Sequence, residues 1–123
     1  MKVKITGTVF HGSHVGRKLG FPTANLDRRQ FVRLEQRPKL GIYAAVAEVE
    51  KKIYKAAVVI GPIDKARLPK VEAHLLNFVG NLYGKKIHLT LIKYIRAFAK
   101  YSNDEALKKQ IAKDVLAVKK LTF

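Results

Sequence analysis

The feature that most restricts the fold of this chain is the interval at which its apolar residues repeat. Val3, Ile5 and Val9 alternate with polar residues, which is the period of a strand that buries one face. Near the C-terminus the interval changes, and apolar residues between 107 and 118 recur at helical spacing. A chain with this pattern is expected to form mostly β-structure with one terminal helix.

Further strands are predicted wherever an apolar or alternating run is bounded by turn residues. These segments are 41–49, 53–60, 71–78 and 85–98. The residues between the first two, 50–52, fit a hairpin turn, and the last segment is long enough to bend or to serve two edges of a barrel. Five or six antiparallel strands and one helix then predict a small closed barrel with the helix packed alongside.

The connections carry polar and turn-forming residues. Residues 27–39 are rich in arginine and predict a solvated surface connection that can hold one helical turn. Residues 63–70 contain Pro69 and predict a loop. Ser102, with Glu105 three residues later, forms a capping box, so the terminal helix is expected to begin with Ser102 as its N-cap.

The composition describes a chain with a sizeable apolar core. It has 123 residues, 48% of them hydrophobic, and no cysteine, so one domain over residues 1–123 without disulfide bonds is expected. No apolar run reaches the ~20 residues of a membrane-spanning helix, and residues 1–7 lack the apolar core of a signal peptide. We therefore expect a cytoplasmic protein that does not enter a membrane.

The charge is strongly positive. The formal net charge is +16, from 25 lysines and arginines against 9 aspartates and glutamates. Such a field attracts polyanions without specificity. It fits a nucleic-acid-binding protein and also an enzyme with anionic substrates, and the charge alone does not separate the two.

Gly16–Leu26 is the first candidate for a site, and its sequence is GRKLGFPTANL. Glycines permit close approach of the backbone to an anion. In an extended segment Thr23 and Asn25 point the same way, and two neutral oxygen ligands suit a hard cation such as Mg2+ that also binds substrate phosphates. The alternative is a turn in which both side chains bond to nearby backbone.

Glu72 is the candidate acid-base residue. In the predicted strand 71–78 it shares one face with His74 and Phe78, so its carboxylate must be paired or held for use as a base. The alternative is a solvated Glu72 that pairs with a lysine. His74 is either its partner or a structural residue, and Phe78 and Tyr83 either join the core or offer a stacking surface for a planar ring.

Several stretches together resemble the riboflavin kinase family. Gly16–Leu26 is similar to the family's G-R-x-L-G-F-P-T-A-N-L signature, and Val71–Phe78 is similar to its V-E-x-H strand. Leu82–Lys85 resembles its L-Y-G-K turn. The family's closing strand and helix are matched by Ile95–Arg96, by Lys100–Ser102, and by the pattern of Leu107, Gln110, Ile111 and Asp114. The motifs occur in order from about residue 5 to residue 118.

The resemblance implies a fold and a reaction. The family has a six-stranded antiparallel Greek-key barrel with a C-terminal α-helix. It transfers the terminal phosphate of ATP to the 5′-hydroxyl of riboflavin, which gives FMN and ADP. The resemblance therefore implies an enzyme with Mg2+ as cofactor and ATP as co-substrate. We expect a monomer with only non-specific contact to nucleic acid, and a chain of 123 residues that makes FMN but not FAD.

Carried over by position, the family's roles fall on residues of the quoted motifs. Glu72 is implied as the general base toward the ribityl hydroxyl, and Thr23 and Asn25 as the groups that hold Mg2+. The residues implied to contact the nucleotide and its phosphates are Gly16, Lys18, Gly20, Phe21, Thr23, Asn25, Leu82 and Tyr83. Arg96 and Leu107 are implied to border the flavin. Phosphoryl transfer chiefly needs positioning, charge neutralisation and one carboxylate near the alcohol, so this set is sufficient.

Three positions depart from the family's pattern. Gly61–Pro69 lacks the Pro-Thr-aromatic run that is common after this strand, and Asn77 and Phe98 stand at or near positions where an acid is frequent. Two alternatives to the kinase stay open. One is a basic barrel that binds nucleic acid, against which stands the scarcity of aromatic residues among the charges. The other is a retired kinase that binds flavin without turnover.

Overall fold

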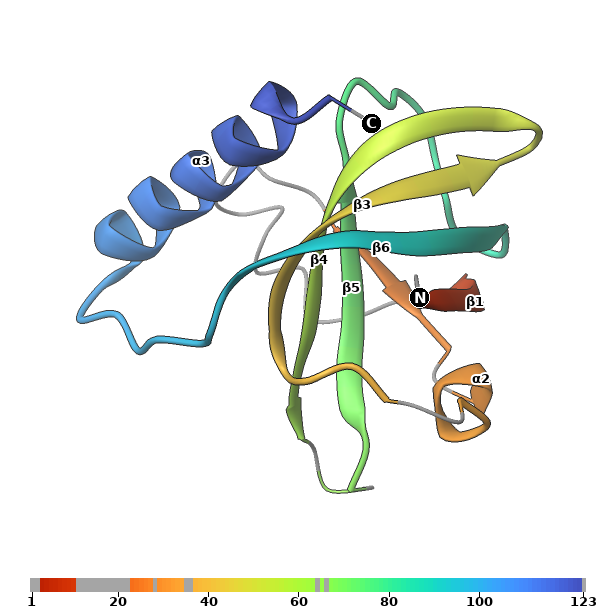
Figure 1. Cartoon of the computed structure of the whole chain (residues 1–123), viewed down its shortest axis with the longest axis horizontal. Coiled ribbons are helices and arrows are strands. Elements are labelled where there is room, and N and C mark those ends of the chain that lie inside the picture. The colour runs from red at the N-terminus through yellow and green to blue at the C-terminus, as the bar shows by residue number, and fades with distance from the viewer. Residues whose placement is uncertain are drawn as a thin grey trace.

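Six antiparallel strands close into a barrel, and one long helix lies against its outside (Figure 1). The computed structural model describes residues 3–10, 23–27, 29–34, 37–63, 65 and 67–122. The strands are β1 (Lys4–Phe10), β2 (Ala24–Leu26), β3 (Gly41–Val49), β4 (Lys52–Ile63), β5 (Pro69–Leu75) and β6 (Lys86–Arg96). The helices are α2 (Arg29–Val32) and α3 (Asp104–Lys120).

The strand order around the barrel is β1-β2-β5-β4-β3-β6. Strands β3, β4 and β5 follow one another, whereas the β2–β5 and β3–β6 pairs join strands that are not consecutive in the chain. Strand β6 pairs with β1, where Lys4 faces Thr90, and also with β3, where the register shifts twice. The predicted barrel is confirmed, and its longest predicted strand serves two edges.

The alternation of residues along β5 separates the inside of the barrel from the outside. Val71, Ala73 and Leu75 are buried in the main core, whereas Glu72 and His74 lie between them in the sequence and are half-buried. Because successive side chains of a strand point to opposite faces, the two polar residues face outward. The core is completed by Phe31 of α2, which is 2% exposed.

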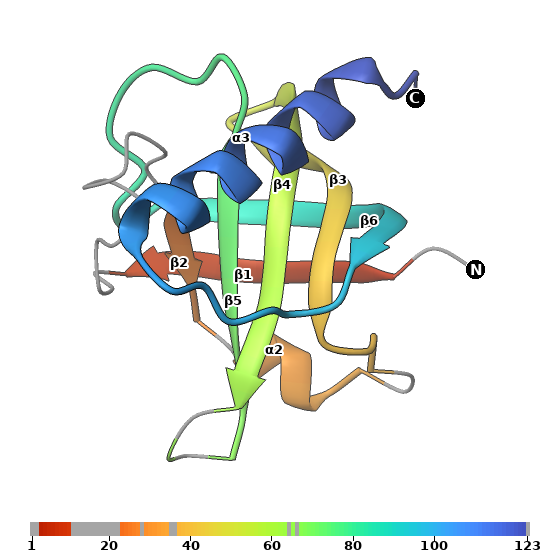
Figure 2. The same cartoon turned by 90° about the vertical axis from the view of Figure 1, so that its left-hand side faces the viewer.

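Helix α3 covers part of the outer wall of the barrel (Figure 2). Val115 and Val118 pack against Ala44 of β3, Ala57 of β4 and Leu76, and these residues form a second buried cluster. The two alanines have short side chains, so the helix can approach the strands closely.

Two predicted boundaries on either side of the 63–70 segment are wrong. Strand β4 continues through Gly61 and Pro62 to Ile63, with a register shift between Ile60 and Ile63. Strand β5 already begins at Pro69, which pairs with Ile63. A bulge at this site accommodates the proline, because an irregular or edge position does not require its missing N–H.

The end of β5 and the start of α3 also differ from the prediction. Strand β5 ends at Leu75, and Asn77 has φ of 65°, a left-handed conformation that asparagine tolerates better than most residues. This turn brings Phe78 against the main core rather than onto the outer face of the strand. The N-cap of α3 is Asn103 and not Ser102, because the Asn103 side chain accepts a hydrogen bond of 2.8 Å from the Ala106 N–H.

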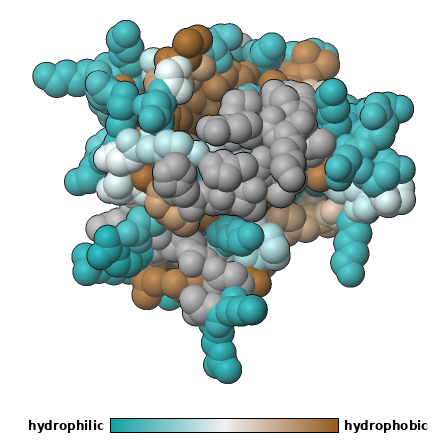
Figure 3. Space-filling view, turned by 180° about the vertical axis from the view of Figure 1, so that it is seen from behind, coloured by the Kyte–Doolittle hydropathy of each residue, from teal (hydrophilic) through white to brown (hydrophobic). Residues whose placement is uncertain are grey.

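Hydrophilic side chains project from several sides of the face seen in Figure 3, with smaller apolar patches between them. Among the described residues, no helix combines the length and the apolar character that crossing a bilayer requires.

The C-terminal end of α3 is bound by a lysine from the barrel. Lys55 of β4 donates through its Nζ to the backbone oxygens of Lys119, at 3.1 Å, and Leu121, at 2.6 Å. A cation at this end also interacts favourably with the helix dipole. We therefore expect Lys55→Met to lower the free energy of unfolding by about 1–3 kcal/mol, measured by urea denaturation.

Lys52→Met is the matched control for this variant, because Lys52 lies on the same strand and is exposed. It is expected to change stability by less than about 0.5 kcal/mol. Equal losses in the two variants would show that the carbonyl contacts of Lys55 do not stabilise the helix.

Candidate active site

Two cavities adjoin at the start of β2. The loop-side cavity has a volume of about 340 Å³ and lies beside the segment that connects β5 to β6. Its lining residues are Val9, Thr23, Ala24, Ala73, Leu75, Phe78, Gly80, Asn81, Leu82 and Tyr83. Besides Thr23 and the core side chains, the lining residues come from the segment 78–83, which includes the predicted turn at Leu82 and Tyr83.

The helix-side cavity has a volume of about 310 Å³ and lies between the barrel and α3. Its polar and charged lining residues are Thr23, Lys70, Glu72, His74, Arg96, Tyr101 and Asp114. The rest of the wall is largely apolar and includes Val59, Phe98, Leu107 and Ile111. Thr23 lines both cavities, so it stands where they meet.

The strand register brings Asn25 beside Glu72. The two residues are direct partners in the antiparallel β2–β5 pair. Directly opposed residues point to the same face, and Ala24 and Leu26 on either side of Asn25 belong to the inner core. The side chains of Asn25 and Glu72 therefore share the outer face, and Thr23 lines the same cavity as Glu72.

Glu72 lies in a half-buried position on this face. Burial raises the pKa of Glu72 above the usual value of a glutamate, and the positive charge of Lys70 partly opposes that effect. Lys70 and Glu72 are two residues apart on β5, and both line the helix-side cavity. A carboxylate with a raised pKa is a better proton acceptor than a fully solvated one.

The turn of the loop-side cavity is fixed to the barrel by backbone hydrogen bonds. The Gly84 N–H donates to the Val9 oxygen at 3.0 Å, and the Val9 N–H donates to the Lys85 oxygen at 2.9 Å. Within the turn, the Tyr83 N–H donates to Asn81 Oδ1 at 2.9 Å. The wall formed by Leu82 and Tyr83 therefore has a defined position relative to β1.

The departure at Phe98 has a local packing reason. A Cβ atom added to Gly61 would lie 2.8 Å from Cε2 of the Phe98 ring, so the ring rests directly on the glycine. Gly61 also has φ of +108°, which other residues rarely adopt. Phe98 thereby adds an apolar ring to the lining of the helix-side cavity, near the position where an acid was expected from the resemblance.

Most of the residues implied by the resemblance fall beside one of the two cavities. Thr23, Glu72, Arg96 and Leu107 line the helix-side cavity, and Leu82 and Tyr83 line the loop-side cavity. The four loop residues Gly16, Lys18, Gly20 and Phe21 lie outside the described residues.

Two further charged residues of the helix-side cavity were given no role by sequence reasoning. Lys70 alternates with the buried residues of β5 as Glu72 and His74 do. A predicted strand that began at Pro69 would have placed Lys70 on the same face as Glu72. Asp114 is a buried charge that pairs with Arg96. Asp114 was noted only as part of the helix pattern. Its partner Arg96 is eighteen residues away in the sequence, so the pair could be identified only from the structure.

The donor set fits a hard cation better than a transition metal. Within the described part of the chain, no group of three or more histidine, aspartate or glutamate side chains could hold a metal. The hydroxyl oxygen of Thr23 and the amide oxygen of Asn25 are ligands of the kind that Mg2+ accepts when it also keeps water and substrate phosphates.

The closed barrel therefore carries two adjoining cavities, and a half-buried carboxylate lines the one between barrel and helix. The family description Flavokinase, riboflavin kinase, matches residues 1–122. The chain belongs to the riboflavin kinase family. The predictions of this family and of the six-stranded barrel are confirmed.

Individual relatives agree with the family match. A bifunctional riboflavin kinase/FMN adenylyltransferase of Buchnera aphidicola is 40% identical over 94% of this chain and 38% of that protein. A riboflavin kinase structure from Trypanosoma brucei has a TM-score of 0.66 and 28% identity over 94% of this chain and 76% of that one. A structure described as a macrolide-efflux protein of Streptococcus pneumoniae has a TM-score of 0.85 and 24% identity, over 98% of this chain and 40% of that one, and shows the fold alone. The chain spans about two fifths of the length of the bifunctional relative.

Proposed function

We propose that this chain transfers the terminal phosphate of ATP to the 5′-hydroxyl of riboflavin, giving FMN and ADP. The observation that carries the proposal is the position of Thr23 at the junction of two cavities, one of which also contains Glu72. Two substrates bound in adjoining cavities can exchange a group only where the cavities meet. The family match supports this reaction over binding of nucleic acid.

In this assignment the nucleotide occupies the loop-side cavity, and its phosphates extend toward Thr23 and Asn25. Leu82 and Tyr83 form the wall that covers it. Riboflavin occupies the helix-side cavity, with its planar ring against the apolar wall that includes Leu107 and Phe98. The ribityl chain then reaches toward Glu72, so that the hydroxyl and the terminal phosphate meet near the junction.

Glu72 accepts the proton of the 5′-hydroxyl in the chemical step. The hydroxyl oxygen forms a bond to the terminal phosphorus as the bond from that phosphorus to the bridging oxygen of ADP breaks. The electron pair of the broken bond remains on ADP, and the proton remains on Glu72 until solvent removes it. The raised pKa of Glu72 increases its basicity, and Lys70 favours the ionised form that the reaction requires.

Thr23 and Asn25 are the residues that would hold Mg2+ together with the phosphates. Bound there, Mg2+ would neutralise charge on the triphosphate. The proposal covers the kinase reaction alone, because the chain aligns with only 38% of the bifunctional relative. A monomeric state, a cytoplasmic location, one domain over residues 1–123 and only non-specific contact with nucleic acid stay predictions from the sequence.

The test is FMN formation from riboflavin, ATP and Mg2+, followed by chromatography of the flavins, with each component omitted in turn. FMN and ADP are expected in equal amounts, and neither is expected when one component is missing. Quenching of riboflavin fluorescence without ADP release would instead identify a flavin-binding protein that has lost its activity.

Lys70→Met is expected to move the acidic limb of the kcat profile to higher pH. Lys70 lowers the pKa of Glu72, so removing its charge raises that pKa and leaves a smaller fraction of the base ionised at a given acidic pH. The measurement is kcat with saturating substrates across the acidic range. Lys93→Met is the matched control, because Lys93 is exposed on β6 and its charge is not among those acting on Glu72. If wild type, Lys70→Met and Lys93→Met gave the same kcat profile, the acidic limb would not report the ionisation of Glu72 under the influence of Lys70.

A further inference from the structure

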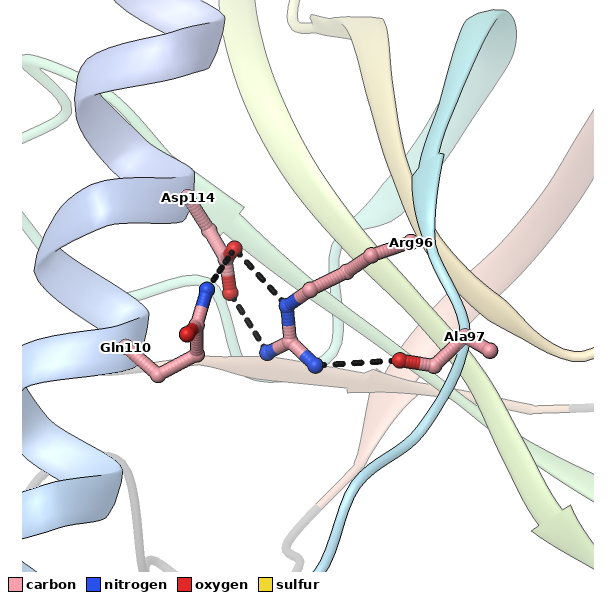
Figure 4. Close-up of polar contacts among 4 residues, drawn as sticks. All are labelled: Arg96, Ala97, Gln110 and Asp114. Atoms are coloured by element: carbon pink, nitrogen blue, oxygen red, sulfur yellow. Dashed lines mark hydrogen bonds and ion pairs between the residues drawn. The ribbon is translucent and has the colours of Figure 1, made fainter.

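A polar cluster joins the end of β6 to the middle of α3 (Figure 4). Arg96 donates to Asp114 twice, through Nε to Oδ1 at 2.9 Å and through Nη2 to Oδ2 at 2.7 Å. Gln110, one helical turn before Asp114, donates through Nε2 to Oδ1 at 3.1 Å. Arg96 also donates through Nη1 to the Ala97 oxygen at 3.1 Å. The guanidinium and the carboxylate are therefore held in one mutual orientation.

The cluster is protected from solvent mainly at its carboxylate. The side chain of Asp114 is 6% exposed and that of Arg96 is 22% exposed. A buried carboxylate is costly unless it is paired and hydrogen-bonded, and a bidentate guanidinium satisfies both of its oxygens. These hydrogen bonds also raise the pKa of Arg96, so the guanidinium keeps its charge. Loss of either partner would leave the other as an isolated charge beside the cavity.

Both residues line the helix-side cavity, together with Leu107 and Ile111 of the same helix. Positions 107, 111 and 114 fall on one face of a helix, so the pair continues the wall that the two apolar residues form. Three of the five N–H groups of a guanidinium are used in the bonds to Asp114 and Ala97. Among the described residues, one N–H group on Nη1 and one on Nη2 therefore have no hydrogen-bond partner.

We propose that Asp114 is a positioning residue for the flavin end of the site, acting through Arg96. It orients the guanidinium so that the remaining donors can meet acceptor atoms at the edge of an uncharged planar ring. It also offsets the charge of Arg96, so that this end of the cavity offers hydrogen bonds without a strong positive field. Gln110 supports Asp114 from the same helix. The inference rests on the proposed function, because it takes riboflavin as the occupant.

The experiment measures riboflavin binding by fluorescence quenching without nucleotide, and then the steady-state constants for both substrates. Asp114→Asn keeps the size of the side chain but has one carbonyl oxygen instead of two carboxylate oxygens, so at most one of the two bonds from Arg96 survives. The Kd and KM for riboflavin are expected to rise roughly tenfold, the change that loss of a hydrogen bond to a charged group produces. The KM for ATP is expected to stay unchanged.

Two comparisons separate positioning from a general loss of structure. Glu105→Gln removes a carboxylate from the exposed first turn of the same helix and is expected to leave riboflavin binding unchanged. Gln110→Ala removes only the supporting bond and is expected to raise the Kd about two- to threefold. If Asp114→Asn fails to fold, the Gln110→Ala variant decides the question. A Gln110→Ala chain that is as stable as wild type and has the wild-type Kd for riboflavin would contradict a positioning role of the cluster.

A double-mutant cycle tests whether Asp114 acts through Arg96. In an Arg96→Met background, Asp114→Asn is expected to have little further effect on the Kd for riboflavin, because the two residues form one unit. Equal effects in the two backgrounds, or an Asp114→Asn chain with wild-type affinity, would overturn the inference while leaving the kinase intact. If the wild-type chain neither binds riboflavin nor forms FMN, the proposed function is wrong and the inference falls with it.

Discussion

Replacement of Glu72 by glutamine is expected to lower kcat by about 10²–10⁴-fold, the usual contribution of a general base. Glutamine keeps the shape of the side chain and can still contact the hydroxyl, but it accepts no proton at neutral pH. The KM values for ATP and riboflavin are expected to change little, since the proposed role of Glu72 is to accept the reacting proton. The measurement is steady-state FMN formation at neutral pH. A rate within a fewfold of wild type would remove Glu72 from the role of base.

The same variant is expected to be more stable than wild type at neutral pH. Burial raises the pKa of Glu72 in the folded chain above its value in the unfolded chain, so ionised Glu72 disfavours the folded state. That penalty is absent below about pH 4, where the carboxyl is protonated in both states. Thermal unfolding should therefore show Glu72→Gln above wild type at pH 7, with the difference vanishing as the pH falls. Such a gain, combined with lost activity, marks a residue that is kept for function.

Replacement of Thr23 by valine is expected to lower kcat/KM for ATP by about 100-fold, the effect of losing one group that stabilises charge at a reacting centre. Valine keeps the branched shape and removes only the hydroxyl. Thr23 lines both cavities, and in the proposed function its hydroxyl acts where the terminal phosphate is transferred. The Mg2+ concentration for half-maximal rate is expected to rise as well, measured by titration at fixed ATP.

Thr23→Ser is the matched control, since serine restores the hydroxyl without the methyl group. It is expected to recover most of the rate and the Mg2+ dependence of wild type. If valine and serine lowered the rate equally, packing of the methyl group and not the oxygen would be responsible. If the valine variant kept a wild-type Mg2+ titration, Thr23 would not lie at the phosphate end of the site.

The barrel was predictable because strands such as β1 and β5 alternate buried and more exposed residues, and because the apolar residues of α3 recur at a different spacing. The wrong strand boundaries lie at single residues whose usual local preference is overridden by the tertiary structure. Pro69 suggested a loop, but the bulge opposite Ile63 accommodates it at the beginning of β5. The alternating segment was predicted to continue to Phe78, but the strand ends at Leu75 and Asn77 adopts a left-handed backbone conformation in the turn that follows.

The candidate site was predictable to the extent that it depends on alternation. Thr23 and Asn25 were expected on one face, and their neighbourhood with Glu72 follows from the β2–β5 register. The register itself was not readable, because it pairs two strands that are separated by β3 and β4 in the chain. The Arg96–Asp114 ion pair was also not predictable, because its partners lie on a strand and a helix that come into contact only in the folded chain.

The pairing of Lys4 with Thr90 has a consequence for how the chain reaches its native state. The seam between β1 and β6 joins positions that are far apart, so the entropy of bringing them together must be overcome before their contacts stabilise anything. A nascent chain cannot pair β1 with β6 until β6 has left the ribosome. Until then β1 and β3 each have one edge without a paired strand. Open edges of this kind recruit other chains, so protection by a chaperone is expected to matter most in that interval.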